Sequence, residues 1–370
     1  MRRQFTIPLS YNPIDADQLV KKLYEYSNAH HDDMIEDFEQ KLGLAAGTKY
    51  AVALNSGTSA IHLGLKALGV GEKDLVLVST FTYVATVNPI LYLNAIPVFI
   101  DSERETWNMD PDVLESAIKS SISGGKKPKV ILVVHTYGMP AQMDRILEVS
   151  HHYDIPILED AAEAIGSSYN NKPLGSFGEI GILSFNNNKI LTTYGGGALL
   201  TNNLSIAEKT LKWSTQSREN LPYNEHSETG FNYRLSPLNA AVGLAELESL
   251  ESNVAKRRTI FDTYRNLLGD LPGVAWQPEP ANSFSNRWFT CMVLRLDVDA
   301  VRQILDSQNI ETRPLWKPMH LQPLMKTYPA FANGTSEELF NTGLCLPSGN
   351  NLREDDISKI VEQIKNGVRC

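Results

Sequence analysis

Six short apolar runs recur through the first two-thirds of the chain, and most are separated by segments long enough to hold a helix. Strands that are apolar throughout, instead of alternating with polar residues, are covered on both faces of their sheet. The runs therefore predict an α/β fold with a largely parallel sheet. They are Tyr50–Leu54, Leu75–Ser79, Ile96–Ile100, Val130–Val134, Ile155–Leu158 and Gly181–Phe185.

The pattern changes after Ser236–Pro237, where an N-cap residue precedes a first-turn proline. A long helical stretch follows, then a strand expected at Trp288–Leu296 and a last helix with apolar residues at the i, i+3, i+4, i+7 spacing from Ile357. A chain of 370 residues is long enough for two domains. We expect a large domain over residues 1–250, N-terminal segment included, and a small C-terminal α+β domain over residues 251–370.

Composition and charge limit the partners and the compartment. The chain has 34 basic and 43 acidic residues, a net charge of −9 and no long basic run, which argues against nucleic acid. Residues 75–100 are uncharged, but their threonines, asparagines and prolines indicate strand, turn, helix and strand, so we expect no membrane span. The N-terminal MRRQFTIPLS has no apolar segment of signal-peptide length, and the three cysteines lack CxxC spacing. Both features favour the cytoplasm.

Ligands of open α/β sheets bind at the carboxyl ends of the strands, so the residues after each apolar run are the candidates. Asn55–Ala60 follows the first run and opens a helix. Its small and hydroxyl side chains leave room for an anion at the helix N-terminus. Ordinary N-capping explains the same serines and threonines equally well.

Two acids, Glu159 and Asp160, directly follow the fifth run, with Glu163 close behind. Carboxylates there suit a metal, a general base or a buried cation. The sequence has no HxH or HxxxH pattern to complete a metal site, so we expect no metal. Acids attracted to a helix N-terminus are the alternative interpretation.

Lys189 follows the sixth run among uncharged residues and precedes the Gly195–Gly197 run. Most lysines lie on solvated helix faces, so this setting is unusual, although the lysine also fits a simple strand end. Carbonyl chemistry through a Schiff base needs an uncharged amine, which desolvation favours.

One ligand, pyridoxal 5'-phosphate, has a chemical group that suits each of these three segments. Its phosphate would lie on Gly57–Ser59 and Ser184, its aldehyde would bond Lys189, and its ring nitrogen would face Asp160. A carboxylate beside that nitrogen keeps it protonated, so the ring can accept electrons from a carbanion. At 4 Å and an effective dielectric constant of 20 the attraction is about 4 kcal/mol.

The chain also resembles the DegT/StrS family of sugar aminotransferases, which have the aspartate aminotransferase (type I) fold and use pyridoxal phosphate. Family-like segments lie along nearly the whole chain: NSGTSAIHLGLKALGVG, STFTYVATVNPI, VVHTYGMPAQMD, LEDAAEAIGS, SFNNNKILTTYGGGALLT, GFNYRLSPLNAA and RPLWKPMHLQP.

The resemblance implies a role for each matching residue. Lys189 is the lysine that bonds the cofactor and moves the proton, Asp160 faces the pyridine nitrogen, and Tyr83 stacks on the ring. Glu163 lies near the ring hydroxyl, and Asn232 reaches the phosphate of the neighbouring subunit, which implies a homodimer with shared active sites. The positions that match the family's phosphate-binding residues are Gly57, Thr58 and Ser184.

Some residues depart from the common family pattern. The glycine segment is TTYGGG where many members have TTGEGG, and Glu163 stands where Gln or His is frequent. Lys189 matters more, because relatives with histidine at this position are dehydratases. Its presence favours amino transfer.

The resemblance implies that L-glutamate donates the amino group and that a nucleotide-linked keto sugar accepts it. Residues 311–322 are most similar to members that aminate carbon four of a UDP-linked 4-keto-6-deoxy-N-acetylhexosamine, as in bacillosamine-type surface glycans. A GDP- or dTDP-linked 3- or 4-keto-6-deoxy sugar is the alternative. Cationic side chains suit the diphosphate and an aromatic ring suits the sugar. The candidates are Arg234, Arg313, Lys317, His320 and Trp316, although core packing also explains Trp316 and a satisfied loop histidine explains His320.

Two other classes of protein remain possible. A non-catalytic sensor that binds the cofactor or a sugar would need a DNA-binding appendage, and the chain shows no basic helix pair for one. A desulfurase would need a mobile nucleophilic cysteine, whereas Cys291 lies in an expected strand and Cys345 precedes Leu346–Pro347.

Overall fold

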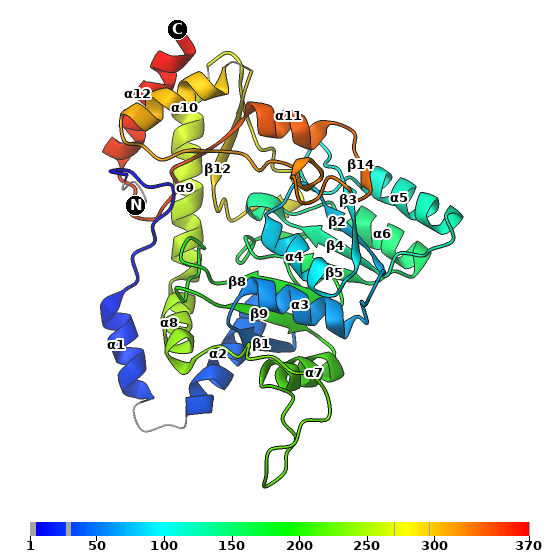
Figure 1. The fold of residues 1–370 in the computed structure, drawn as a ribbon. Helices are drawn as coiled ribbons and strands as arrows, with labels where there is room; N and C mark the ends of the chain where they lie inside the picture. Colours follow the sequence, from blue (N-terminus) through cyan, green and yellow to red (C-terminus); the bar gives the residue numbers. More distant parts are fainter. Residues whose placement is uncertain (1–4, 27–30, 270, 296, 370) are drawn as a thin grey trace.

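The computed structural model describes residues 5–26, 31–269, 271–295 and 297–369 (Figure 1). An eight-stranded sheet in the order β1-β9-β8-β5-β4-β2-β3-β14 forms its centre. All pairs are parallel except those of β9, which runs antiparallel to both β1 and β8. This sheet confirms the predicted α/β class. Its strands are β1 Tyr50–Leu54, β2 Leu75–Ser79, β3 Ile96–Ile100, β4 Val130–Val134, β5 Ile157–Asp160, β8 Ile180–Ser184, β9 Gly197–Thr201 and β14 Ala330–Phe331.

The first four predicted strands have the predicted bounds, and two others are shifted. Strand β5 begins two residues later than predicted and includes both acids, Glu159 and Asp160. Strand β8 begins one residue earlier than predicted. Strand β9 was not predicted, because Gly197–Thr201 is short and follows a glycine run that is typical of a loop.

Helices cover both faces of the sheet, as the apolar strands require (Figure 1). Residues 75–100 form β2, α4 and β3, as predicted. No helix within the described residues is long and apolar enough to cross a membrane. One face packs against α3 Gly57–Ala67, α4 Val84–Tyr92 and α7 Leu204–Ser214, and the other against α2 His31–Ala46, α5 Pro111–Ser123, α6 Met143–Tyr153 and α8 Pro237–Glu248.

A second, antiparallel sheet with its own apolar core lies in the C-terminal part. The strand expected at Trp288–Leu296 is β12, and Leu296 lies outside the described residues. Ile7 from the N-terminal segment bridges Ile310 and joins this core, so the segment packs against C-terminal elements. The elements are β10 Val274–Trp276, β12 Thr290–Leu294, β13 Arg313–Pro314, β15 Gly343–Leu346, α9 Leu250–Leu268, α10 Val298–Ser307 and α12 Glu354–Arg369.

Helices α8 and α9 meet at Ser249, next to the domain boundary expected after residue 250, and that division stays a prediction. Helix α1 packs on α8. The remaining elements are α1 Ala16–Glu25, α11 Thr335–Thr342, β6 Ser168–Tyr169, β7 Lys172–Pro173, β11 Ser283–Phe284 and the short 3₁₀ turns η1 Thr136–Gly138 and η2 Met319–Leu321.

Candidate active site

The carboxyl ends of β5 and β8 and the residues after β1 meet at one edge of the large sheet. Asp160 is the last residue of β5 and Ser184 the last of β8. Gly57 opens α3 directly against Ser184, because a Cβ on this glycine would lie 3.0 Å from the Ser184 Cβ. A Cβ on Gly197 would lie 2.4 Å from the Gly57 nitrogen, so small residues are required on both sides. The fold therefore brings the predicted anion cradle and the strand-end carboxylate to the same edge.

The start of α3 is capped by its own serines. Ser56 is the N-cap, and its Oγ accepts a hydrogen bond of 3.0 Å from the Ser59 N–H. The Ser59 hydroxyl donates to Asn55 Oδ1 at 2.6 Å and is buried. Thr58 is half-buried in the same turn. The capping interpretation thus describes Ser56 and Ser59, while the dipole of the capped helix still attracts an anion.

Asp160 is a buried carboxylate with two neutral donors. Its Oδ2 accepts from the Thr86 hydroxyl at 2.7 Å, and its Oδ1 accepts from the Ala162 N–H at 3.1 Å. Burial raises the pKa of this carboxyl above its usual value, and the hydrogen bonds from Thr86 and Ala162 act in the opposite direction. A cation placed beside Asp160 would favour the ionised form.

The neighbouring acid, Glu159, faces the other side of the strand and binds backbone groups there. Its oxygens accept hydrogen bonds from the backbone N–H groups of Gly175, Phe177 and Gly178, and His135 Nε2 lies 3.0 Å from its Oε2. Successive side chains in a strand point to opposite faces. Both acids therefore lie at the strand end, as predicted, but only Asp160 faces the candidate site.

Lys189 and Glu163 form a buried ion pair at this edge. The Lys189 Nζ lies 3.3 Å from Glu163 Oε1, and the exposed fractions of the two side chains are 11% and 5%. Burial raises the pKa of Glu163 to about 7. The same Nζ lies 4.0 Å from the centroid of the Trp288 ring, which adds a cation–π contact.

Two residues that hold this pair were not predicted as site residues. Tyr137 donates its backbone N–H to Glu163 Oε2 at 2.8 Å. Its φ of 56° lies in the left-handed region, which residues other than glycine seldom adopt. Trp288 begins the expected strand but comes from the C-terminal part of the chain, so no local pattern placed it beside Lys189.

Tyr83 is the N-cap residue of α4, and 59% of its surface is exposed. The first turn of α4 also holds Thr86, which contacts Asp160. The ring of Tyr83 therefore extends from an element that borders the site.

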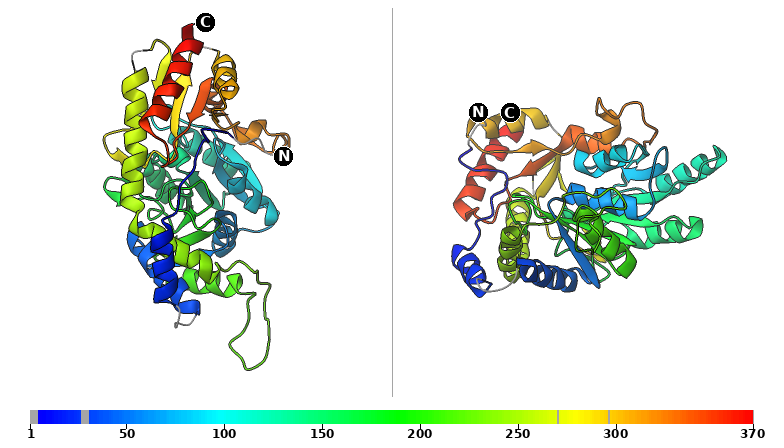
Figure 2. Two further views of the ribbon diagram at one scale, coloured as in Figure 1. Left: turned by 90° about the vertical axis from the view of Figure 1, so that its left-hand side faces the viewer. Right: turned by 60° about the horizontal axis from the view of Figure 1, so that its bottom comes forward.

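Asn232 is exposed and lies beside the residues after β1. Its carbonyl oxygen accepts from Asn55 Nδ2, and its Oδ1 accepts from Gln216 Nε2, each at 3.2 Å. The segment between α7 and α8 extends away from the body as a long loop (Figure 2), and Asn232 lies at the base of this loop, where it bridges Thr215. The role predicted for Asn232 in a neighbouring subunit stays a prediction.

Two of the predicted substrate cations already have acidic partners within the chain. Arg234 forms a bidentate ion pair with Glu39, and only 19% of the Arg234 side chain is exposed. Arg313 pairs with the neighbouring Glu311 at 2.6 Å but is 62% exposed. Lys212 on helix α7, which is not among the predicted residues, pairs with Glu219 in the same way. These cations are thus neutralised locally, and the roles of Arg234 and Arg313 toward substrate stay predictions.

Three further predicted residues lie on the segment between β13 and α11. His320 lies between Thr80 Oγ1, at 2.7 Å from its Nδ1, and Glu337 Oε1, at 3.2 Å from its Nε2. Trp316 is half-buried, and its ring centroid lies 4.7 Å from that of Tyr137. Trp316 thus packs on the residue that holds Glu163. Lys317 is exposed.

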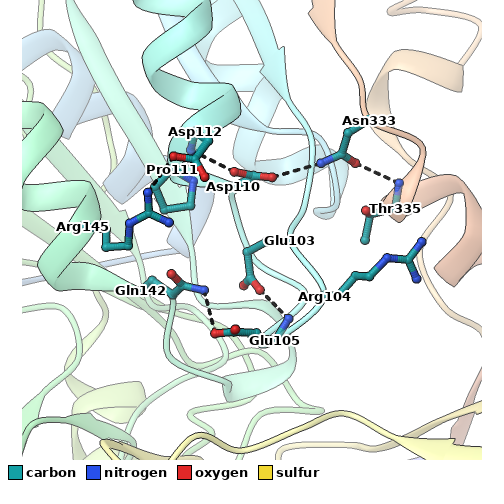
Figure 3. A pocket seen from close by; sticks show the side chains of 10 residues that line it. All are labelled: Glu103, Arg104, Glu105, Asp110, Pro111, Asp112, Gln142, Arg145, Asn333 and Thr335. Carbon is teal, nitrogen blue, oxygen red and sulfur yellow. Dashed lines mark hydrogen bonds and ion pairs between the residues drawn. The ribbon is translucent and has the colours of Figure 1, made fainter.

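A polar cavity of about 390 Å³ lies elsewhere, near the N-termini of α5 and α6 (Figure 3). Its charged side chains bond to one another: Arg145 pairs with Asp112, and Asn333 bridges to Asp110. None of the predicted site residues lines it. Within the described ranges no group of three or more His, Cys, Asp or Glu side chains is placed to hold a metal ion.

The residues at the sheet edge fit pyridoxal phosphate in three ways. A buried carboxylate, Asp160, makes no ion pair within the described residues. A cradle between Gly57 and Ser184 has no room for a Cβ but presents a helix N-terminus. An amine, Lys189, lies between an acid and an aromatic ring.

The sequence profile of the DegT/DnrJ/EryC1/StrS aminotransferase family matches residues 15–365. The chain belongs to this family. It is 47% identical over 335 residues to EpsN of Bacillus subtilis (strain 168), assigned to the pyridoxal phosphate-dependent aminotransferases, with 89% of this chain and 86% of EpsN covered. It is 34% identical over 366 residues to the GDP-perosamine synthase of Escherichia coli O157:H7, with 96% and 98% covered.

A solved family structure agrees with this assignment. The DegT DnrJ EryC1 StrS aminotransferase from Brucella abortus superposes with a TM-score of 0.87 at 30% identity, over 95% of both chains. The protein is therefore a pyridoxal phosphate-dependent enzyme of the sugar-nucleotide aminotransferases, and its family implies a keto-sugar nucleotide and an amino donor as substrates.

Proposed function

We propose that this enzyme transfers the amino group of L-glutamate to carbon four of a UDP-linked 4-keto-6-deoxy-N-acetylhexosamine, in the cytoplasm, for a bacillosamine-type surface glycan. The observation that carries the aminotransferase chemistry is the buried Lys189–Glu163 pair at the sheet edge beside Asp160. The sugar is proposed from the likeness of residues 311–322 to enzymes of that specificity.

When bound, the cofactor supplies an aldehyde that takes up the amino group and a protonated ring that withdraws electrons from the donor's α-carbon. Lys189 Nζ would accept the α-proton of the amino donor and give it back. Asp160 would face the ring nitrogen in its ionised form, while Glu163 would hold the lysine near the ring hydroxyl. The residues proposed to hold the phosphate and the ring are Gly57, Thr58, Ser59, Ser184 and Tyr83.

A homodimer with shared sites completes the proposal. Asn232 of a second subunit would donate to the phosphate, and this proposal is supported by its exposed position at the base of the long loop between α7 and α8. On the sugar side, Arg313 and Lys317 are exposed and free to reorient toward a diphosphate, and Trp316 offers a ring face. Arg234 and His320 would have to exchange their present partners.

The second candidate is a GDP-linked keto sugar, favoured by the 34% identity to a GDP-perosamine synthase over nearly the whole chain. A panel of UDP-, GDP- and dTDP-linked keto sugars, each incubated with glutamate and the holoenzyme, separates the two. We expect the mass of an amino sugar with the UDP-linked 4-keto substrate. Product only with a GDP- or dTDP-linked sugar would replace the proposed substrate, and no product with any of them would contradict the function.

A further inference from the structure

Arg257 on helix α9 is fully buried and has only neutral partners. Its Nη1 donates to the carbonyl oxygens of Trp288, at 3.1 Å, and Ser348. Its Nη2 donates to Asn12 Oδ1 at 2.7 Å and to Ser10 Oγ at 3.2 Å. No ion pair to Arg257 is found in the described part of the chain, and burial lowers its pKa to about 9. A buried charge without a counter-charge is costly, and here four neutral acceptors compensate for it.

Three of these four partners hold the backbone of the Lys189 loop. The Asn12 Nδ2 donates to the Lys189 carbonyl oxygen at 2.5 Å. The Ser10 hydroxyl donates to the Asn188 carbonyl oxygen at 3.2 Å, and the indole Nε1 of Trp288 donates to the same oxygen at 2.7 Å. Three side chains from two distant segments therefore converge on two consecutive carbonyl groups.

The chemistry of the guanidinium fixes the direction of these hydrogen bonds. Arginine has five N–H donors and no acceptor, so the Asn12 amide must turn its oxygen to Arg257 and its NH₂ to Lys189. The Ser10 hydroxyl, which accepts from Arg257, is likewise left with its own proton for Asn188. The backbone N–H of Asn350 also donates to Asn12 Oδ1, at 3.3 Å, so Arg257 shares the orientation of Asn12 with Asn350, whereas at Ser10 the guanidinium is the donor that sets the direction.

The Trp288 connection reaches the reactive amine itself. Arg257 holds the backbone of Trp288, and the ring of this tryptophan lies 4.0 Å from Lys189 Nζ. The N-terminal segment that supplies Ser10 and Asn12 runs beside α9 before it enters α1 (Figure 1). Both the backbone and the side chain of Lys189 are thus held by groups that Arg257 orients.

We propose that Arg257 is a positioning residue for Lys189, acting through Ser10, Asn12 and Trp288 to hold the lysine amine where it bonds the cofactor aldehyde. The inference rests on the proposed role of Lys189. It predicts that weakening this network lowers the affinity for the aldehyde form of the cofactor, which needs the amine. Weakening the network should leave the affinity for pyridoxamine phosphate nearly unchanged, because this form of the cofactor has no aldehyde and cannot bond Lys189.

The test measures the dissociation constants of pyridoxal phosphate and pyridoxamine phosphate for the cofactor-free, full-length protein, together with its thermal midpoint. Asn12→Ala is expected to weaken pyridoxal phosphate binding about tenfold, in keeping with the loss of one well-formed hydrogen bond, and to change pyridoxamine phosphate binding less than twofold. Ser10→Ala is expected to act in the same direction more weakly, and Arg257→Lys more strongly.

Two controls make the outcome decisive. Arg258→Ala removes the next arginine of α9, which pairs with Glu279 at 2.7 Å, and is expected to leave both constants unchanged. Lys189→Ala must weaken pyridoxal phosphate selectively, or the proposed function itself fails. If it does so while folded Asn12→Ala and Ser10→Ala weaken both ligands equally or neither, the positioning role is overturned and the proposed function stands.

Discussion

The cofactor side and the substrate side of this site are built differently. On the cofactor side, Asp160 and Ser184 end neighbouring strands, and the amine of Lys189 meets a buried acid. On the proposed substrate side, Arg313 on the two-residue edge strand β13 and Lys317 on the segment after it are exposed, and the arginine already pairs with Glu311. Buried strand ends fix side chains against a rigid sheet, whereas exposed cations are screened by water and nearby acids. The groups proposed to bind the cofactor are thus preorganised, whereas those proposed to bind the sugar nucleotide can exchange partners.

The largest expected effect is on the cofactor side. Lys189→Ala is expected to lower the rate of amino transfer by about a thousandfold or more, because proton transfer by a positioned base contributes up to about 10⁴-fold. The contacts to the phosphate and ring nitrogen do not involve the amine, so the cofactor should still bind without a covalent bond. Product formation and cofactor content are measured after gel filtration. Lys172→Ala, on an exposed lysine, serves as the control, and normal turnover in Lys189→Ala would refute the assignment.

The two adjacent acids of β5 offer the next test. Asp160→Asn is expected to lower kcat about a hundredfold or more with little change in thermal midpoint, because an attraction of about 4 kcal/mol to the ring nitrogen is lost. Glu159→Gln is expected to lower the thermal midpoint and to leave kcat nearly unchanged, since Glu159 accepts hydrogen bonds from three backbone N–H groups and faces His135. A catalytic defect in Glu159→Gln, with normal kcat in Asp160→Asn, would exchange the two roles.

The pH dependence of stability isolates Glu163. Its pKa is raised from 4.5 to about 7 by burial, so between these values the folded protein binds more protons than the unfolded chain. The free energy of unfolding of the cofactor-free protein should therefore fall as pH rises through this window. Glu163→Gln removes this titratable carboxyl group and should make the plot of unfolding free energy against pH flatter than that of the wild type. Parallel denaturant-unfolding curves for the two proteins from pH 5 to pH 8 would be inconsistent with this account.

The smallest effects are expected on the substrate side, where two arginines should behave differently. Arg313→Ala should raise the KM for the nucleotide sugar about tenfold and leave stability within about 0.5 kcal/mol, because its pair with Glu311 is exposed. Arg234→Ala should lower the thermal midpoint, since it leaves the partly buried Glu39 without its cation. Steady-state kinetics and thermal unfolding measure both. An unchanged KM in Arg313→Ala would remove Arg313 from the substrate site.

The sequence located most strands of the large sheet and the side chains at their ends, because apolar runs mark buried strands; the cofactor contacts of those side chains stay predictions. Four strands had the predicted bounds, and Lys189 and Glu163 do lie together. Strand β5, however, begins two residues later than predicted, and only the pleat of the strand separates Glu159 from Asp160. Residues such as Trp288, which contact Lys189 across a long separation in sequence, carry no local pattern. The pairing of Arg234 with Glu39 was invisible for the same reason.

Reduction of the holoenzyme with borohydride, followed by proteolysis and mass spectrometry of the peptides, tests the central claim most directly, because it makes the bond between lysine and cofactor permanent. The account predicts the pyridoxyl label on the peptide that contains Lys189. A label on another lysine, or no label at all, would contradict it.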